Sequence, residues 1–213
     1  MDSGLKLPQQ AFVNKFIAKN KFYERANISS RLQKEFIDKI QRITWKYKLA
    51  EETIGISKTD KITEIQLFEL ELKEQVIPER VLKVIDRAIP YQILYKFQYK
   101  DSFAWGITLK EGNKAENYYF SEWDKPVLFD FNGIDLEKVY QKLIKAFIEV
   151  GSETKKDFSE LVASDANKKQ LQTEITVLDN KIKREKQFNR KVDLNKHLLD
   201  KKQKLNKIQE ELS

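Results

Sequence analysis

A period of two residues runs through the segment Ile62-Thr-Glu-Ile-Gln-Leu-Phe-Glu-Leu-Glu-Leu-Lys73. Side chains that alternate in this way point to opposite faces of a β-strand. One face carries Phe68, Leu70 and Leu72, and the other carries Ile65, Leu67, Glu69, Glu71 and Lys73. The pattern predicts the central strand of a sheet, with charged residues toward the end of one face.

The residues that follow predict a helix and then three more strands. Pro78 suits the first turn of a helix. Beyond that helix, apolar and aromatic residues alternate over 91–99, 103–109 and 117–120, with turn residues between these segments. We expect these three strands to pair antiparallel in sequence order. An amphipathic helix over 136–148 is expected to pack on the sheet and to close the body.

Upstream of the central strand, the apolar spacing is helical. A short helix is predicted from Phe12, Val13, Phe16 and Ile17. The segment Ser30-Arg-Leu-Gln33 has the form of a capping box that opens a longer helix. The buried stripe of that helix is expected to contain Leu32, Phe36, Ile40, Ile43 and Tyr47. The sequence therefore predicts an α+β body, residues 1 to 150, in which helices flank an antiparallel sheet.

Residues 165–213 differ from this body in composition and in charge. They contain neither Gly nor Pro, and they carry 13 Lys and Arg against 8 Asp and Glu. Residues 1–164 carry 27 against 25. A mainly polar segment, residues 151–164, separates the two parts and is interpreted as a linker. We therefore expect a nearly neutral body followed by a basic coiled-coil or helical-hairpin arm.

The arm contains two apolar stripes in different frames. Leucines and isoleucines at 171, 175, 178 and 182 occupy heptad core positions, and those at 194, 198, 205, 208 and 212 follow a second frame. The frame changes between residues 183 and 192, so the arm either continues as one helix through a phase shift or folds back as a hairpin. The hairpin is the preferred interpretation because it buries both stripes without a second chain. A homodimeric scaffold joined by its tails is the alternative.

The segment Lys181-Ile-Lys-Arg-Glu-Lys-Gln-Phe-Asn-Arg-Lys191 lies at this break and carries six basic residues against one acidic residue. Clusters of this kind neutralise phosphates, and an aromatic ring among them can stack on a base. A solvated helix face can also be basic without binding anything. The candidate contacts to nucleic acid or to a protein partner are Lys181, Lys183, Arg184, Lys186, Phe188, Asn189, Arg190 and Lys191.

The central strand suggests a second candidate site, formed by Glu69, Glu71 and Lys73. A carboxylate beside an ammonium group can hold Mg²⁺ and position the water that attacks a phosphodiester, as in restriction-endonuclease-like nucleases. Asp60, at the preceding turn, would join Glu69 and Glu71 as a metal ligand. Glu and Lys also alternate on many exposed strands, and the expected strand order is not that of the nuclease core. A nuclease is therefore the alternative function, and a chain without enzyme activity or cofactor is the leading expectation.

Composition argues against several other classes of protein. The chain has no cysteine, which excludes disulfides, thiolate metal clusters and cysteine nucleophiles. Its single histidine, His197, lies in the charged arm, and it has no Gly-rich phosphate loop, so a catalytic triad and a nucleotide-hydrolysing loop are not expected. Apolar segments are shorter than the roughly 20 residues that span a bilayer, and a signal-peptide pattern is absent. We therefore expect a cytoplasmic protein without membrane contacts. Its tryptophans, Trp45, Trp105 and Trp123, are expected in the core or lining a groove.

Six segments together carry a family resemblance. They are Leu7-Pro8, residues 14–23, Ile43-Thr-Trp-Lys-Tyr-Lys-Leu-Ala-Glu-Glu-Thr53, residues 65–73, Ala88-Ile-Pro-Tyr91 and Lys186-Gln-Phe-Asn-Arg-Lys-Val-Asp-Leu-Asn195. As a set, over nearly the whole chain, they resemble the bacterial domain-of-unknown-function family number four-three-nine-one. The resemblance implies no established activity for any residue.

The resemblance does imply a genomic setting beside helicases and DNA methyltransferases of restriction-modification or phage-defence type. A basic helical arm agrees with that setting. We therefore expect a non-catalytic accessory subunit of a bacterial DNA-processing complex. In this interpretation the arm binds a helicase or methyltransferase partner, DNA, or both.

Overall fold

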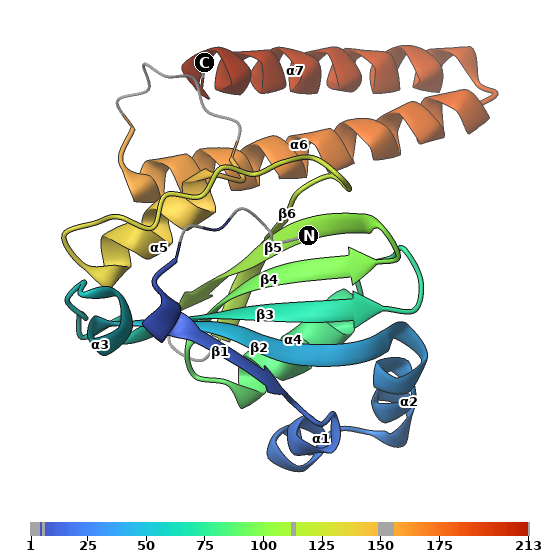
Figure 1. The fold of residues 1–213 in the computed structure, drawn as a ribbon. Coiled ribbons are helices and arrows are strands. Elements are labelled where there is room, and N and C mark those ends of the chain that lie inside the picture. The colour runs from blue at the N-terminus through green and yellow to red at the C-terminus, as the bar shows by residue number, and fades with distance from the viewer. Residues whose placement is uncertain (1–4, 6, 112–113, 149–155, 213) are drawn as a thin grey trace. The chain divides into compact units, whose positions relative to one another are not determined.

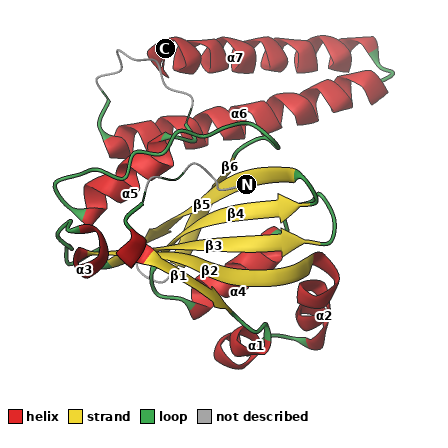
Figure 2. Cartoon of the chain, in the orientation of Figure 1, coloured by secondary structure: helices red, strands yellow, loops and turns green. Residues whose placement is uncertain are grey.

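The computed structural model describes residues 5, 7–111, 114–148 and 156–212. The chain divides into two compact units, residues 1–147 and 148–213. The first unit is built on a six-stranded sheet with helices, and the second is helical (Figures 1 and 2). The α+β class and the C-terminal helical arm predicted from the sequence are confirmed.

The strands of the sheet lie side by side in the order in which they occur in the chain. They are β1 (Phe12–Phe16), β2 (Ile40–Ala50), β3 (Glu64–Leu72), β4 (Gln92–Tyr99), β5 (Ser102–Glu111) and β6 (Lys114–Phe120). Strands β4, β5 and β6 pair antiparallel, as predicted, but β3 and β4 pair parallel. Helix α4 (Glu79–Ala88) connects β3 to β4, and strands joined by such a crossover run in the same direction. The expectation of a wholly antiparallel sheet is therefore corrected at this pair.

Helices pack on both faces of the sheet. The face that carries Phe68 and Leu70 is covered by α1 (Asn20–Ala26), α2 (Ser30–Lys39) and α4, whose apolar residues form one core cluster with it. The opposite face is contacted by α5 (Leu136–Lys145). The alternation predicted for residues 62–73 is thus present in β3, which is buried on both faces until Phe68.

Residues 12–16 form an edge strand, β1, where the sequence predicted a short helix. A 3-10 turn, η1 (Gln9–Ala11), precedes this strand. β1 pairs antiparallel with β2, with a register shift between Phe12 and Lys15. Just beyond β1, the N–H of Ile17 donates to the carbonyl of Ile43 over 3.0 Å. In so short a segment the helical and strand spacings are not distinguishable, and aromatic and β-branched residues favour strands.

Residues 40–50 form strand β2, where the sequence predicted that the preceding helix continues. Helix α2 is capped by Ser29, whose hydroxyl accepts the N–H of Leu32 over 3.4 Å, and ends at Lys39. Ile40 and Ile43 are fully buried, as predicted, but on a strand. The pairing of β2 with β3 contains two register shifts. Bulges of this kind shift the two-residue alternation, so the buried positions of β2 imitate helical spacing. A short helix, α3 (Glu51–Ile54), follows β2.

The second unit is an antiparallel helical hairpin of α6 (Phe158–Arg184) and α7 (Phe188–Leu212). An ion pair between Lys156 and Glu211, 2.8 Å long, joins its open end, and Lys201 pairs with Glu174 near its middle. The hairpin prediction is confirmed, and Leu171 and Leu198, one from each predicted stripe, are buried. Residues 158–164 of the expected linker belong to α6, while residues 151–155 lie outside the described part of the chain. None of the helices described is long and apolar enough to cross a membrane.

Candidate functional site: the basic tip of the helical hairpin

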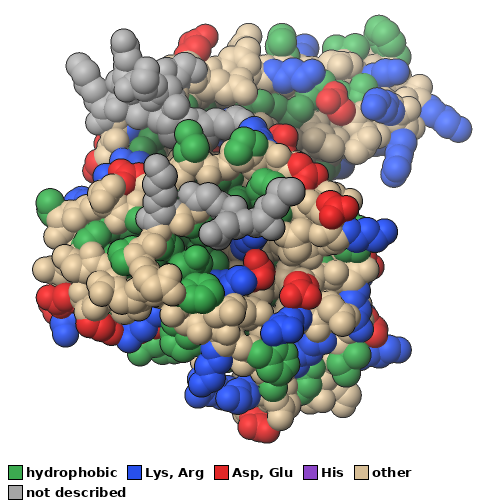
Figure 3. All heavy atoms as spheres, in the orientation of Figure 1, with side chains coloured by type: hydrophobic (Ala, Val, Ile, Leu, Met, Phe, Trp, Pro, Cys, Tyr) green, Lys and Arg blue, Asp and Glu red, His purple; other side chains and the backbone are tan. Residues whose placement is uncertain are grey.

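The basic run lies where the hairpin reverses direction, and we call residues 181–191 the basic tip. Lys181, Lys183 and Arg184 form the last turn of α6, and Arg190 lies in the first turn of α7. Unpaired carbonyl groups at the C-terminus of a helix favour nearby cations, so the end of α6 accommodates three of them. Figure 3 shows Lys and Arg side chains gathered at this end of the hairpin.

The side chains predicted to make contacts are all exposed: Lys181, Lys183, Arg184, Lys186, Phe188, Asn189, Arg190 and Lys191. Phe188 is 79% exposed, which is unusual for an aromatic residue in a well-packed protein. Throughout the described part of the chain, none of the six cations of the tip forms an ion pair with a carboxylate. Their positive charge therefore faces solvent.

Glu185 is the one acidic residue of the tip, and its carboxylate stabilises the turn. Its Oε1 accepts the backbone N–H of Lys186 over 2.8 Å and that of Gln187 over 2.9 Å. These backbone hydrogen bonds, chiefly that from Gln187, together with the charge of Arg190, lower the pKa of Glu185. The carboxylate thus fixes the backbone between the two helices instead of pairing closely with a cation.

A hollow of 520 Å³ lies in the tip between the end of α6 and the first turns of α7. Basic side chains dominate its charge, with two carboxylates, one imidazole and one leucine completing the lining. The residues are Lys181, Arg184, Glu185, Arg190, Asp193, Leu194 and His197. With the imidazole neutral, three cations face two carboxylates, and Lys183, Lys186 and Lys191 stand nearby in the sequence. An anion such as a phosphate or a partner's carboxylate is the chemistry that this surface complements.

The cations of this hollow were predicted from the sequence, whereas Asp193, Leu194 and the exposed His197 were not selected as site residues. A signal for them exists in the spacing. Arg190, Asp193, Leu194 and His197 are separated by three, four and seven residues, which places them on one face of a helix. That face becomes a wall of the hollow only because α7 packs against α6. The sequence of α7 alone does not predict this packing.

Glu69 lies between two lysines on the face of the sheet that α5 contacts. Its Oε1 is 3.3 Å from the Nζ of Lys46 and its Oε2 is 3.4 Å from the Nζ of Lys96. Glu71 lies two residues further along the same face, opposite Arg42 in the pairing of β3 with β2. The two carboxylates therefore lie on one face of β3, next to basic residues of β2 and β4.

The remaining residues of the predicted nuclease site, Asp60 and Lys73, lie outside β3, one before the strand and one after it. Lys73 follows the last residue of β3, is exposed, and donates its backbone N–H to the carbonyl of Lys39 over 2.9 Å. Asp60 precedes β3, and Glu64 at the start of that strand is already roughly 16 Å from Glu69 at the usual rise per residue. Among the residues that the structure describes, no three His, Asp or Glu side chains are grouped so that they could hold a metal ion.

Comparison with known proteins gives one match. A family model described as "Domain of unknown function (DUF4391)" matches residues 5–205, which covers both units. No curated protein and no solved structure matches the chain.

Proposed function

The chain belongs to the DUF4391 family, and we propose that it is a non-catalytic accessory subunit of a bacterial DNA-processing complex that holds DNA through its basic tip. The observation that carries this proposal is the set of six exposed cations at the tip without a carboxylate partner in the described chain. The restriction or phage-defence setting, with a helicase or DNA methyltransferase as partner, is part of the proposal and rests on the family resemblance.

The six cations of the tip form no ion pair that would stabilise the fold in the described chain, whereas binding of phosphates would use their charge. Each cation that neutralises a phosphate releases a condensed counterion, so binding weakens steeply as salt is added. Phe188 projects into solvent among these cations, and an exposed ring in a basic setting stacks on an unpaired base. The tip therefore combines a sequence-independent electrostatic contact with one stacking surface.

The experiment reverses three cations at once, in the variant R184E/K186E/R190E. The matched control is K202E/K204E/K207E, which changes the net charge of the same hairpin by the same amount through exposed lysines of α7 outside the tip. Fluorescence anisotropy with a labelled DNA oligonucleotide is measured over a series of salt concentrations. We expect the tip variant to bind DNA much more weakly. The slope of log binding constant against log salt concentration is expected to become shallower by roughly 0.9 for each of the three lost phosphate contacts. The control is expected to retain most of the binding.

An equal loss of DNA affinity in both variants would show that only the overall net charge of the hairpin matters. Unchanged DNA affinity in the tip variant would overturn the proposal. The same pair of variants tests the protein partner. If only the tip variant fails to co-purify with the helicase or methyltransferase, while its DNA binding is unaffected, the tip binds the protein partner and not DNA. Light scattering of the same samples reports whether the chain forms the homodimer that was the third interpretation.

The nuclease is a second candidate, favoured by the adjacent carboxylates of Glu69 and Glu71 on one face of β3. Lys96, 3.4 Å from Glu69, supplies the neighbouring ammonium group in place of Lys73. With Mg²⁺ or Mn²⁺, this candidate predicts cleavage of DNA that Glu71→Gln abolishes while binding is retained. Cleavage that persists in Glu71→Gln eliminates the site, and a protein that binds DNA without cleaving it supports the accessory role.

A further inference from the structure

A second hollow lies in the first unit, between α1, the end of α4 and the sheet, and has a volume of 230 Å³. Its lining combines aromatic rings, one buried amide and two cations. The residues that define its chemistry are Lys21, Arg25, Trp45, Gln66, Phe68 and Tyr91. The volume is below the range of about 300 to 1,000 Å³ typical of pockets for drug-sized ligands, so it suits a single ring system.

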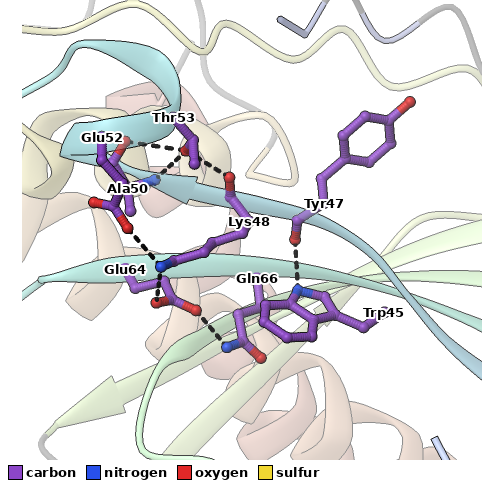
Figure 4. Close-up of polar contacts among 8 residues, drawn as sticks. All are labelled: Trp45, Tyr47, Lys48, Ala50, Glu52, Thr53, Glu64 and Gln66. Carbon is purple, nitrogen blue, oxygen red and sulfur yellow. Dashed lines mark hydrogen bonds and ion pairs between the residues drawn. The ribbon is translucent and has the colours of Figure 1, made fainter. Parts of the chain in front are cut away.

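A hydrogen bond to the backbone fixes the position of Trp45, one of the aromatic residues that line the hollow. Trp45 is half-buried on β2, and its indole N–H donates to the carbonyl of Tyr47 over 2.9 Å (Figure 4). This bond falls where the pairing of β2 with β3 shifts register. Because the polar edge of the indole is bonded to the backbone, the apolar part of its ring remains to line the hollow. Phe68 and Tyr91 extend this surface.

The buried amide has a fixed orientation. Gln66 is only 6% exposed, and its Nε2 donates to Oε1 of Glu64 over 2.5 Å. Lys48 holds Glu64 from the other side, with its Nζ 3.6 Å from Oε2. Since a carboxylate accepts and does not donate, the amide nitrogen must face Glu64, and the amide oxygen of Gln66 is turned away from it (Figure 4). The hollow therefore contains a directed hydrogen-bond acceptor.

Two cations stand at the rim. Lys21 and Arg25 are four residues apart on α1, so they project from the same face of that helix. Both are exposed, and within the described part of the chain neither forms an ion pair. An aromatic cleft with an acceptor at its wall and two unpaired cations at its entrance matches a ligand with a flat ring, an amino group and a negative charge.

We propose that this hollow binds one nucleotide unit, whose base stacks on Trp45, whose exocyclic amino group donates to the Gln66 oxygen, and whose phosphate lies against Lys21 and Arg25. Base-to-aromatic stacking with a cation near the backbone is how proteins hold unpaired nucleotides. The same chemistry is offered by a free mononucleotide and by an unpaired nucleotide within a strand. The site is separate from the basic tip and does not depend on the role proposed for it.

The test uses the full chain carrying R184E/K186E/R190E, so that phosphate binding at the basic tip does not contribute. Adenosine monophosphate is titrated and followed by amide chemical shifts. Trp45→Ala is expected to weaken binding about ten-fold or more, in line with the loss of one stacked base. Arg25→Glu is expected to weaken binding of adenosine monophosphate but not of adenosine. Lys34→Glu, an exposed reversal on α2 outside the hollow, is the matched control and is expected to leave both unchanged.

Recognition of the amino group is tested with the monophosphate of purine riboside, which lacks it. The protein with Gln66 intact is expected to bind adenosine monophosphate several-fold more tightly than purine riboside monophosphate. Gln66→Leu is expected to remove this preference. Tighter binding of an oligoadenylate than of the mononucleotide assigns the site to a strand, and equal binding per nucleotide assigns it to free nucleotides. Absence of shifts around Trp45 at millimolar nucleotide, or binding that Trp45→Ala and Arg25→Glu leave intact, overturns the proposal.

Discussion

The sheet unit and the hairpin differ in how they treat their charges. In the sheet unit, several lysines of the strands are paired with carboxylates: Lys46 and Lys96 flank Glu69, and Lys110 pairs with Asp86 over 3.3 Å. In the hairpin, ion pairs occur along the helices, but the described residues provide none for the six cations of the basic tip. Charges that are matched within a chain serve its folding, whereas a cluster left unmatched is free to attract a partner. Under the proposed function, the difference separates a structural use of charge from a binding use.

Lys110 is the strongest case of matched charge. Its side chain and that of Asp86 are fully buried. Its Nζ also donates to the backbone carbonyls of Asp86, Ile89 and Tyr91 over 2.7 to 3.0 Å. Burial lowers the pKa of Lys110, and the charge of Asp86 opposes that shift. The ammonium group thus closes the end of α4 and neutralises a carboxylate in the core.

The largest effect is therefore expected from Lys110→Met. The change leaves Asp86 without its countercharge and several carbonyls without a donor, so the free energy of unfolding is expected to fall by about 3 to 5 kcal/mol. Urea unfolding followed by circular dichroism measures it. Lys142→Met, which removes an exposed pair with Asp130, is the matched control and is expected to change stability far less. A small loss in Lys110→Met would show that the buried pair is dispensable.

The fold followed from the sequence wherever a pattern was long and local. Residues 62–73 and the strands between Gln92 and Phe120 alternate over many residues, and the two stripes of the hairpin repeat over several turns. Strand β2 was missed because its bulges make Ile40 and Ile43 fit helical spacing, and only its neighbours β1 and β3 decide between the two periods. Tertiary pairing overrides local pattern in such a segment.

The sites followed the same rule. The cations of the basic tip lie within the eleven residues 181–191, so the charge of the sequence alone predicted the cluster. The hollow around Trp45 joins α1, β2, β3 and the residues after α4, which are distant in the chain. Its character depends on the fixed amide of Gln66, which is a consequence of packing and has no sequence signature. Charge concentration is visible in a sequence, whereas a pocket built from separate elements is not.

A smaller effect on stability is expected at the basic tip itself. R184E/K186E/R190E breaks no ion pair in the described chain, but it replaces a cation in the last turn of α6 with an anion and adds negative charge around Glu185. Its free energy of unfolding is therefore expected to fall by only about 1 kcal/mol. Urea unfolding of this variant beside K202E/K204E/K207E checks the expectation. A marked loss confined to the tip variant would mean that these cations hold the hairpin together, and the loss of DNA binding would then have a structural cause.

The smallest effect concerns two carboxylates whose pKa values are lowered for different reasons. In the sheet unit, the hydrogen bond from Lys142, followed by that from the backbone of Asn132, lowers the pKa of Asp130 to about 2. In the tip, the pKa of Glu185 is lowered chiefly by the backbone N–H of Gln187. For both groups the folded pKa lies below the unfolded one. Each therefore stabilises the fold above the unfolded value, near 4, and loses that contribution as pH falls through the folded value.

Carboxyl carbon shifts measured by NMR from neutral pH down to about 2 separate the two causes. Lys142→Met is expected to return the midpoint of Asp130 toward its ordinary value, because its main donor is gone. Arg190→Met is expected to move the midpoint of Glu185 only slightly, because the backbone donors remain. In Glu185→Gln, the amide shifts of Lys186 and Gln187 are expected to lose their dependence on pH. A large shift of Glu185 in Arg190→Met would show that the tip neutralises part of its own charge, which would weaken the contrast between the two units.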